Sequence, residues 1–226
     1  MKKFAVIVAG GIGQRMGVEI PKQFLLLRGK PVLWYTINTF LKTYDDLDVI
    51  LVLPLAHLES GEELRNSFVN KERIKIVSGG LTRFHSVQNG LKTIKEESVV
   101  FVHDGVRCLI TKDLVRNCYE QAIEKGSAVP AVASSDSIRI ADGEKNYVAD
   151  RDTVRLIQTP QTFVSEIILP AFEQEFSHAF TDEATVVEAS GKEIFLIEGE
   201  YNNLKITRPI DLLIAEKILE ERSAFE

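Results

Sequence analysis

The sequence lacks the cysteine patterns of a disulfide-linked or zinc-binding protein. Cys108 and Cys118 are the only cysteines in 226 residues, and their spacing matches neither CxxC nor a zinc pattern with nearby histidines. The four histidines are scattered along the chain, and no HExxH motif occurs. We therefore expect two inert, buried thiols and no zinc site.

The sequence also lacks a long apolar segment and an excess of basic residues. The N-terminal apolar run, Phe4 to Ala9, is too short for a signal sequence or a membrane span. A formal net charge of -6 argues against prolonged contact with a nucleic-acid backbone, although a few well-placed cations can still bind one small anion. We expect a cytoplasmic protein with neither a membrane nor a nucleic-acid partner.

Several short apolar runs, each followed by a stretch of helical periodicity, indicate an α/β fold. A length of 226 residues suits one domain, and 45% hydrophobic with 27% charged residues is ordinary for a globular chain. Strands this apolar, separated by helices, predict a mostly parallel, twisted sheet covered on both faces. The runs are Phe4 to Ala9, Val49 to Leu53, Ile74 to Val77, Val99 to Val102 and Ala128 to Val132.

The segments between these strands and after the last of them give further local predictions. One helical face combines Leu33, Ile37, Phe40 and Leu41, and another combines Val87, Leu91 and Ile94. We expect a short strand around 156–158, a helix over 167–176 and a helix over 181–190 that begins at Thr181 as N-cap and ends before Gly191 as C′ residue. A last βα unit completes the chain.

Residues 133–155 interrupt this alternation and read as a polar β-hairpin. The turn signal Asp142-Gly143 separates two short strand-like stretches. An isolated hairpin is only marginally stable in water, so the arm is expected to lie on the main domain or on another subunit. A mobile surface loop is the alternative. We treat residues 1–226 as one domain that carries this arm.

A glycine-rich loop follows the first strand, where residues 9–17 read AGGIGQRMG and residues 21–23 read PKQ. Gly10, Gly11 and Gly13 allow backbone N–H groups to approach a polyphosphate, and Arg15 and Lys22 can neutralise its charge. The spacing matches neither a Walker loop nor GxGxxG. The loop therefore predicts phosphate binding, with a plain structural turn as the alternative.

Two further motifs follow the third and fourth strands. Gly79 and Gly80 lead into Arg83 and Ser86, and together with the first loop they form a natural site for a base, with the Ser86 hydroxyl at its edge. The carboxyl ends of parallel strands are where such ligands bind. A bare turn is the alternative for this loop.

The fourth strand ends in the sequence HDGVR, residues 103–107. Asp104 suits a magnesium ion held between phosphate oxygens, since Mg²⁺ prefers one or two carboxylates plus substrate phosphates. The alternative is a salt bridge from Asp104 to Arg107. His103 is interpreted as a packed or hydrogen-bonded neighbour.

The remaining polar motifs are dispersed through the second half of the chain. Lys205 lies in a predicted strand between Leu204 and Ile206, where an outward-pointing side chain would be the default. The other positions are Arg151, Thr159, Thr181 and Asp182.

Seven ordered motifs resemble one enzyme family over residues 4–215. They are AGGIGQRM, PKQF, GGLTRFHSV, HDGVR, QTPQ, TDEA and NLKITRP. In this order they resemble the 2-C-methyl-D-erythritol 4-phosphate cytidylyltransferases of the non-mevalonate isoprenoid pathway. The resemblance implies a Rossmann-like αβα nucleotidyltransferase domain, and a homodimer in which the β-arm clasps the partner.

The resemblance also implies roles for individual residues. Arg15, Lys22 and Lys205 match catalytic cations around the phosphates, and the CTP site would comprise Gly10, Gly11, Gly13, Gly79, Gly80, Arg83, Ser86 and Asp104. The acceptor site would comprise Arg107, Ser137, Arg151, Thr159, Thr181 and Asp182, with the arm residues reaching the partner's acceptor. Leu81, Cys108 and Ser137 depart from the residues usual in the family.

The expected reaction is in-line transfer of CMP from CTP to the phosphate of a sugar-alcohol phosphate, with Mg²⁺. An acceptor phosphate is already ionised near neutral pH, so positioning and charge neutralisation suffice. Ribitol 5-phosphate is the rival acceptor, and a non-catalytic nucleotide-binding relative is the rival from another class.

Overall fold

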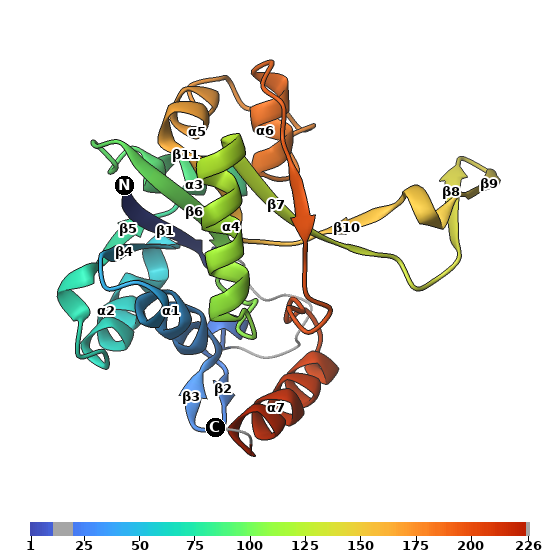
Figure 1. Ribbon diagram of the computed structural model, residues 1–226. Helices are drawn as coiled ribbons and strands as arrows, with labels where there is room; N and C mark the ends of the chain where they lie inside the picture. The colour runs from blue at the N-terminus through green and yellow to red at the C-terminus, as the bar shows by residue number, and fades with distance from the viewer. Residues whose placement is uncertain (11–19, 225–226) are drawn as a thin grey trace.

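An eight-stranded mixed sheet forms the centre of the computed structural model, which describes residues 1–10 and 20–224 (Figure 1). Seven strands follow the order β10-β7-β11-β6-β1-β4-β5, and β12 pairs with β7. The pairs β5-β4-β1-β6 are parallel, whereas β11 runs antiparallel to both β6 and β7. The strands are β1 (Lys2–Val8), β4 (Leu47–Leu53), β5 (Ile74–Ser78), β6 (Ser98–Asp104), β7 (Ser127–Ala133), β10 (Arg155–Ile157), β11 (Gln161–Val164) and β12 (Leu196–Glu198).

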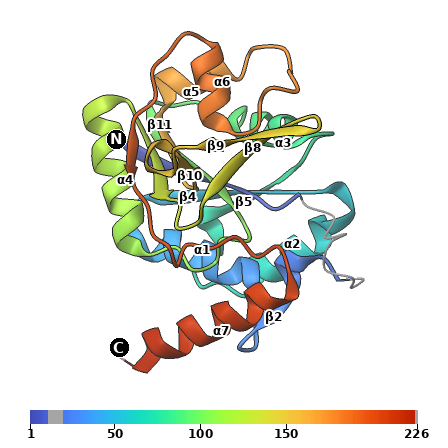
Figure 2. The same cartoon turned by 90° about the vertical axis from the view of Figure 1, so that its right-hand side faces the viewer.

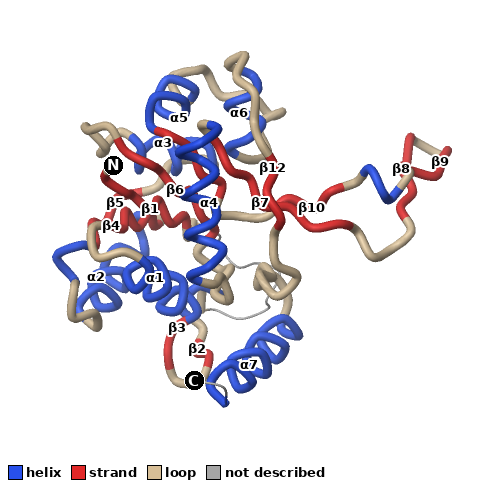
Figure 3. Tube along the Cα trace, viewed as in Figure 1, coloured by secondary structure: helices blue, strands red, loops and turns tan. Residues whose placement is uncertain are grey.

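Helices cover both faces of this sheet (Figure 3). The helices α1 (Val32–Thr43), α2 (Leu58–Asn66) and α4 (Lys112–Lys125) pack on one face, and α3 (Arg83–Leu91), α5 (Ser165–Ala171) and α6 (Glu183–Ala189) pack on the other. Alternation along β1 explains the continuous apolar run, because Ala5 and Ile7 enter the first core and Val6 and Val8 the second. The predicted two-sided burial is confirmed.

A third apolar cluster attaches the C-terminal helix to the body. Helix α7 (Pro209–Ala224) contributes Ala215, which packs with Leu27 and Val106 in this cluster. Short elements complete the fold: η2 (Lys22–Phe24), β2 (Leu26–Leu27), β3 (Lys30–Pro31), η3 (Leu55–His57), η4 (Lys71–Arg73) and η5 (Arg151–Thr153). None of the helices within 1–10 and 20–224 has the length and apolar composition needed to cross a membrane.

The predicted hairpin exists and projects from the body (Figure 1), and in Figure 2 it lies in front of the body, pointing toward the viewer. Strands β8 (Ile138–Asp142) and β9 (Lys145–Ala149) form a separate two-stranded sheet, with Gly143 at a positive φ of 58° in the turn. The pairing of Ile140 with Tyr147 places two exposed apolar side chains on one face of the hairpin. The arm is therefore less polar than the sequence interpretation held.

Three local predictions require correction, and one strand was missed. The helix expected over 167–176 is α5, which ends at Ala171, and the antiparallel strand β11 was not predicted. Helix α6 is capped by Asp182, not Thr181, through a capping box with Thr185, while Gly191 does follow the helix at a φ of 81°. Lys205 lies in a segment without strand pairing, because residues 203–207 instead bridge the body and α7.

Candidate active site

A cavity of about 660 Å³ opens at the carboxyl ends of β1, β4, β5 and β6. Parallel strands that end together deliver their following loops to the same sheet edge, which is where ligands bind in such sheets. The lining brings together most of the predicted nucleotide-site residues that the structure describes, namely Gly10, Lys22, Gly79, Gly80, Arg83, Ser86, Asp104 and Lys205.

The Gly79-Gly80 loop is held against the start of α3 by Ser86. The Gly80 N–H donates to Ser86 Oγ at 3.0 Å, and this hydroxyl donates in turn to Thr82 O at 2.9 Å. A Cβ on Gly79 would lie 2.9 Å from Ser86 Oγ, and one on Gly80 would lie 2.5 Å from His85 Cβ. A side chain at either position would therefore force Ser86 or His85 to shift, and the Ser86 hydroxyl is engaged in fixing the loop.

Asp104, at the end of β6, is a nearly buried carboxylate surrounded by cations. Its Oδ2 lies 2.8 Å from Lys205 Nζ and 3.7 Å from Arg107 Nε, while its Oδ1 lies 3.3 Å from Arg83 Nη2. Burial by itself would raise the pKa of Asp104, but the three cations hold it far below the ordinary range. The salt bridge to Arg107, posed as an alternative to metal binding, is thus present as one of three.

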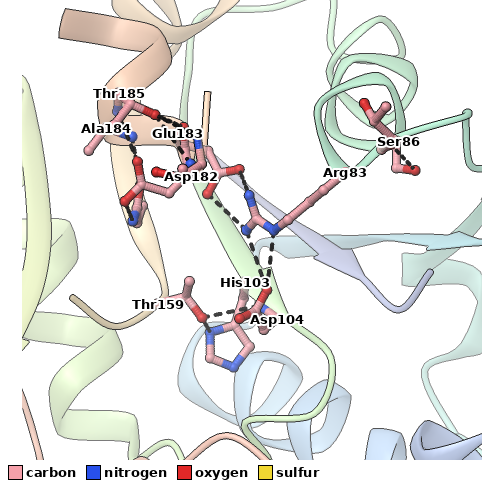
Figure 4. Close-up of polar contacts among 12 residues, drawn as sticks. Arg83, Ser86, His103, Asp104, Thr159, Asp182, Glu183, Ala184 and Thr185 are labelled. Carbon is pink, nitrogen blue, oxygen red and sulfur yellow. Dashed lines mark hydrogen bonds and ion pairs between the residues drawn. The ribbon is translucent and has the colours of Figure 1, made fainter. Parts of the chain in front are cut away.

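Arg83 connects Asp104 to a second carboxylate on another element (Figure 4). Its Nη1 donates to Glu183 Oε1, and its Nη2 donates to Glu183 Oε2 at 3.0 Å. Glu183 is only 1% exposed, and burial raises its pKa although Arg83 opposes the effect. Sequence reasoning missed Glu183, yet a signal was available, because it shares the buried face of α6 with Val186 and Val187.

Lys22 and Lys205 approach the cavity from opposite ends of the chain. Lys22 Nζ donates to Ile206 O at 3.0 Å, which ties η2 to the segment that carries Lys205. Ile206 N in turn donates to Val106 O at 3.0 Å, so this segment is fixed beside the loop after β6. Two cations from distant parts of the sequence thereby reach the same cavity.

Thr159 and His103 support Asp104 from behind. Thr159 Oγ1 accepts the Asp104 N–H at 3.1 Å and lies 3.0 Å from His103 Nδ1, while His103 Nε2 lies 3.2 Å from Arg107 O. Thr159 is buried and is not among the described residues that line the cavity. The structure thus places its hydroxyl in internal hydrogen bonds, and confirms His103 as a hydrogen-bonded neighbour.

The predicted acceptor residues do not converge on this cavity within one chain. Ser137 and Arg151 are exposed on the projecting arm, where Arg151 Nε lies 3.8 Å from Asp152. Arg107 donates to Asn203 O at 2.7 Å, and Thr181 is exposed beside α6. The Asp182 carboxylate accepts from Thr185 N and from Gln161 Nε2 at 2.9 Å each.

Three residues predicted for the phosphate-binding loop, Gly11, Gly13 and Arg15, lie outside the described residues.

Comparison with known proteins agrees with this arrangement of motifs. Residues 4–221 match the family model described as 2-C-methyl-D-erythritol 4-phosphate cytidylyltransferase. A protein of that name from Phocaeicola vulgatus is 42% identical, and the alignment covers 97% of this chain and 100% of that protein. One from Clostridium botulinum is 39% identical over 97% of this chain and 98% of its own.

Solved structures agree with the sequence comparisons. The 4-diphosphocytidyl-2C-methyl-D-erythritol synthase from Anaerococcus prevotii superposes with a TM-score of 0.82 at 29% identity, covering 97% of this chain and 96% of that one. The 2-C-methyl-D-erythritol 4-phosphate cytidylyltransferase from Thermus thermophilus gives a TM-score of 0.72 at 29% identity, covering 95% and 98%. With the family model and these relatives matching nearly the whole length, the chain belongs to the 2-C-methyl-D-erythritol 4-phosphate cytidylyltransferase family.

Proposed function

We propose that this chain transfers CMP from CTP to 2-C-methyl-D-erythritol 4-phosphate, which yields 4-diphosphocytidyl-2-C-methyl-D-erythritol and pyrophosphate. The observation that carries the proposal is the cavity in which the Gly79-Gly80 loop, Lys22 and the Asp104–Lys205 ion pair meet, in a chain of this family. Both substrates are water-soluble phosphate esters, and we place the reaction in the cytoplasm.

The proposed chemistry is one in-line displacement at the α-phosphorus of CTP. An oxygen of the acceptor phosphate forms a bond to the α-phosphorus, the bond from that phosphorus to the bridging oxygen breaks, and pyrophosphate leaves with the electron pair. Lys22 and Arg15 are proposed to stabilise the charge on the α-phosphoryl and the leaving pyrophosphate. Gly10, Gly11 and Gly13 would supply N–H groups to the phosphates, and the Gly79-Gly80 loop would contact cytosine.

We propose magnesium as the cofactor and Asp104 as the side chain that would hold it. Asp104 is the one carboxylate residue among the described residues that line the cavity, and its low pKa keeps it ionised. Residues 1–10 and 20–224 contain no cluster of three or more metal-binding side chains. One carboxylate nevertheless fits Mg²⁺, which is held largely by substrate phosphates in such sites. When bound, Mg²⁺ would neutralise triphosphate charge.

Pyrophosphate release tests the proposed activity and its metal requirement. The protein is incubated with CTP and methylerythritol phosphate, with Mg²⁺ or with a chelator, and pyrophosphate is followed continuously. Release that requires CTP, acceptor and metal is expected. Tight CTP binding without release would favour a non-catalytic relative, and release only with ribitol 5-phosphate would favour the rival acceptor.

We propose that the protein is a homodimer in which the arm reaches the partner's acceptor site. Three observations support this assignment. The hairpin packs little apolar surface of its own, Ile140 and Tyr147 are 43% and 54% exposed on one of its faces, and Arg151 is an exposed arm residue that is not among the described residues lining the cavity. Exposed apolar strips of this kind mark interaction surfaces. Arg151 and Ser137 would then contact the acceptor in the other subunit.

Subunit mixing tests the shared site. Arg151→Ala and Lys22→Ala are each expected to be nearly inactive as pure proteins. If the arm acts in trans, a mixed dimer has one site with both lesions and one with neither, so activity returns on exchange. No recovery after demonstrated exchange, or a monomer by ultracentrifugation at working concentration, would reject the shared site.

A further inference from the structure

Most of the N–H donors of Arg83 face carboxylates inside the protein. An arginine offers five N–H donors. Nε and Nη2 lie 3.4 and 3.3 Å from Asp104 Oδ1, and Nη1 and Nη2 also donate to the two oxygens of Glu183. Although Arg83 lines the cavity, its fork is directed at two carboxylates, which leaves it poorly suited to bind a nucleotide phosphate with two parallel bonds.

Glu183, the partner of Arg83, is held in place by the hydrogen bonds at the start of α6. It lies in the first turn of α6, where its neighbour Asp182 forms the capping box and the Ala184 N–H donates to Gln161 Oε1 at 2.7 Å. A carboxylate that is only 1% exposed costs solvation energy, and its ion pair repays that cost only in part. Stability alone is therefore a weak reason for a charge at this position.

We propose that Glu183 and Arg83 form a positioning pair for Asp104. Glu183 holds the guanidinium, the guanidinium holds Oδ1 of Asp104, and Oδ2 is thereby directed at Lys205, 2.8 Å away at the cavity wall. Figure 4 shows the contacts of Arg83 with Glu183 and Asp104, with Arg83 lying between the two carboxylates. Neither Glu183 nor Arg83 needs to touch a substrate.

Through Asp104 the pair joins three elements: α3 and β6, which follow each other in the chain, and α6, which is remote from both. Glu183 begins α6, Arg83 begins α3, and Asp104 ends β6. A shift of either helix would move the guanidinium and, with it, the carboxylate beside Lys205. This inference refines the proposed function, because it concerns the orientation of a group in that site, and it replaces the expectation that Arg83 binds CTP.

The first experiment separates turnover from nucleotide binding. Glu183→Gln keeps the shape of the side chain and removes its charge, so kcat is expected to fall about tenfold or more, since small misplacements of reacting groups are costly. The calorimetric Kd for CTP is expected to change less than threefold. A kcat within twofold of wild type, or a Kd for CTP that rises as much as kcat falls, would overturn the proposal.

A charge-free double variant separates positioning from stability. Replacing both partners, as Arg83→Met with Glu183→Leu, removes the buried charges together and is expected to restore thermal stability relative to Glu183→Gln, but not kcat. This variant also carries the test if Glu183→Gln fails to fold. Leu64→Ala, in the opposite core, is the matched control that should lower Tm and leave kcat unchanged. Recovery of kcat together with Tm would show a purely structural pair and overturn the proposal.

A mutant cycle identifies Asp104 as the group acted upon. In an Asp104→Asn background, Glu183→Gln is expected to lower kcat by less than twofold, because the orientation it controls has already lost its function. Independent, multiplicative losses of kcat would refute the action of the positioning pair on Asp104. Wild-type turnover in the same assay shows separately whether the proposed reaction occurs, so failure of the positioning pair and failure of the proposed function are distinguishable.

Discussion

The buried imidazole of His103 makes a quantitative prediction about stability and pH. The ring is 0% exposed and lies edge-on to Phe40, with 5.3 Å between ring centroids. Thr159 Oγ1 accepts the Asp104 N–H and can donate to Nδ1, so the neutral ring uses its Nε2–H for Arg107 O. Burial lowers the pKa of His103 to about 4.

Proton linkage gives the sign and size of the effect of pH on the free energy of unfolding. The pKa of an unfolded histidine is about 6.5, so the native state binds fewer protons between that pH and about pH 4. Stability is therefore fully present above the unfolded pKa and falls as the pH drops through this window. At about 1.4 kcal/mol for each pKa unit, the loss between about pH 7 and about pH 4.5 is roughly 2 kcal/mol.

Urea unfolding of wild type and His103→Gln tests this value. Glutamine cannot take up the proton, and its amide can still donate toward Arg107 O. The two proteins are unfolded at both pH values in metal-free buffer, where contributions of the other titrating groups cancel in the comparison. Wild type should lose roughly 2 kcal/mol more than the variant on acidification. Parallel pH dependences would refute a neutral, buried His103.

Three further predictions concern the cavity and the cysteines. Lys22→Ala should lower turnover about 10²-fold or more with the fold intact by circular dichroism, because a cation that acts in the transition state is lost; near-normal turnover would remove Lys22 from this role. CTP should be preferred over UTP by about 10²-fold or more in kcat/KM, because the amino and carbonyl groups at one ring position place opposite demands on a fixed loop; comparable values would disprove base reading by residues 79–80. Burial raises the pKa of Cys108 and of Cys118 to about 12, so a thiol reagent near about pH 8 should label them only after unfolding, and fast labelling of native protein would contradict their burial.

The strands could be predicted because their signal is local. Val49 to Leu53 and Val99 to Val102 are buried on both faces, so every residue is apolar and the run is unambiguous. Strand β11 escaped prediction because Gln161 and Thr162 are buried polar residues, and Gln161 is satisfied by partners on α6 that the sequence does not reveal. In β11, hydrogen bonds to other elements stabilise the buried polar side chains, so the strand forms without an apolar run in the sequence.

The site could be predicted only in part, because some of its contacts depend on tertiary packing and not on local sequence. Residues after strand ends, such as Gly79 and Asp104, meet at one edge because parallel topology requires it. The coupling of Arg83 to Glu183 spans 100 residues and depends on how α6 is oriented by its cap, which no spacing rule encodes. Lys205 likewise reaches Asp104 from an irregular segment and not from a strand.

The most direct test of the central claim follows the α-phosphorus of CTP. CTP labelled at that phosphorus is incubated with the protein, Mg²⁺ and methylerythritol phosphate, and the products are separated. We predict that the label enters a new cytidine diphosphate ester only when this acceptor is present, with an equal amount of unlabelled pyrophosphate. Label that stays in CTP, or that is transferred equally well to ribitol 5-phosphate, would contradict the assignment.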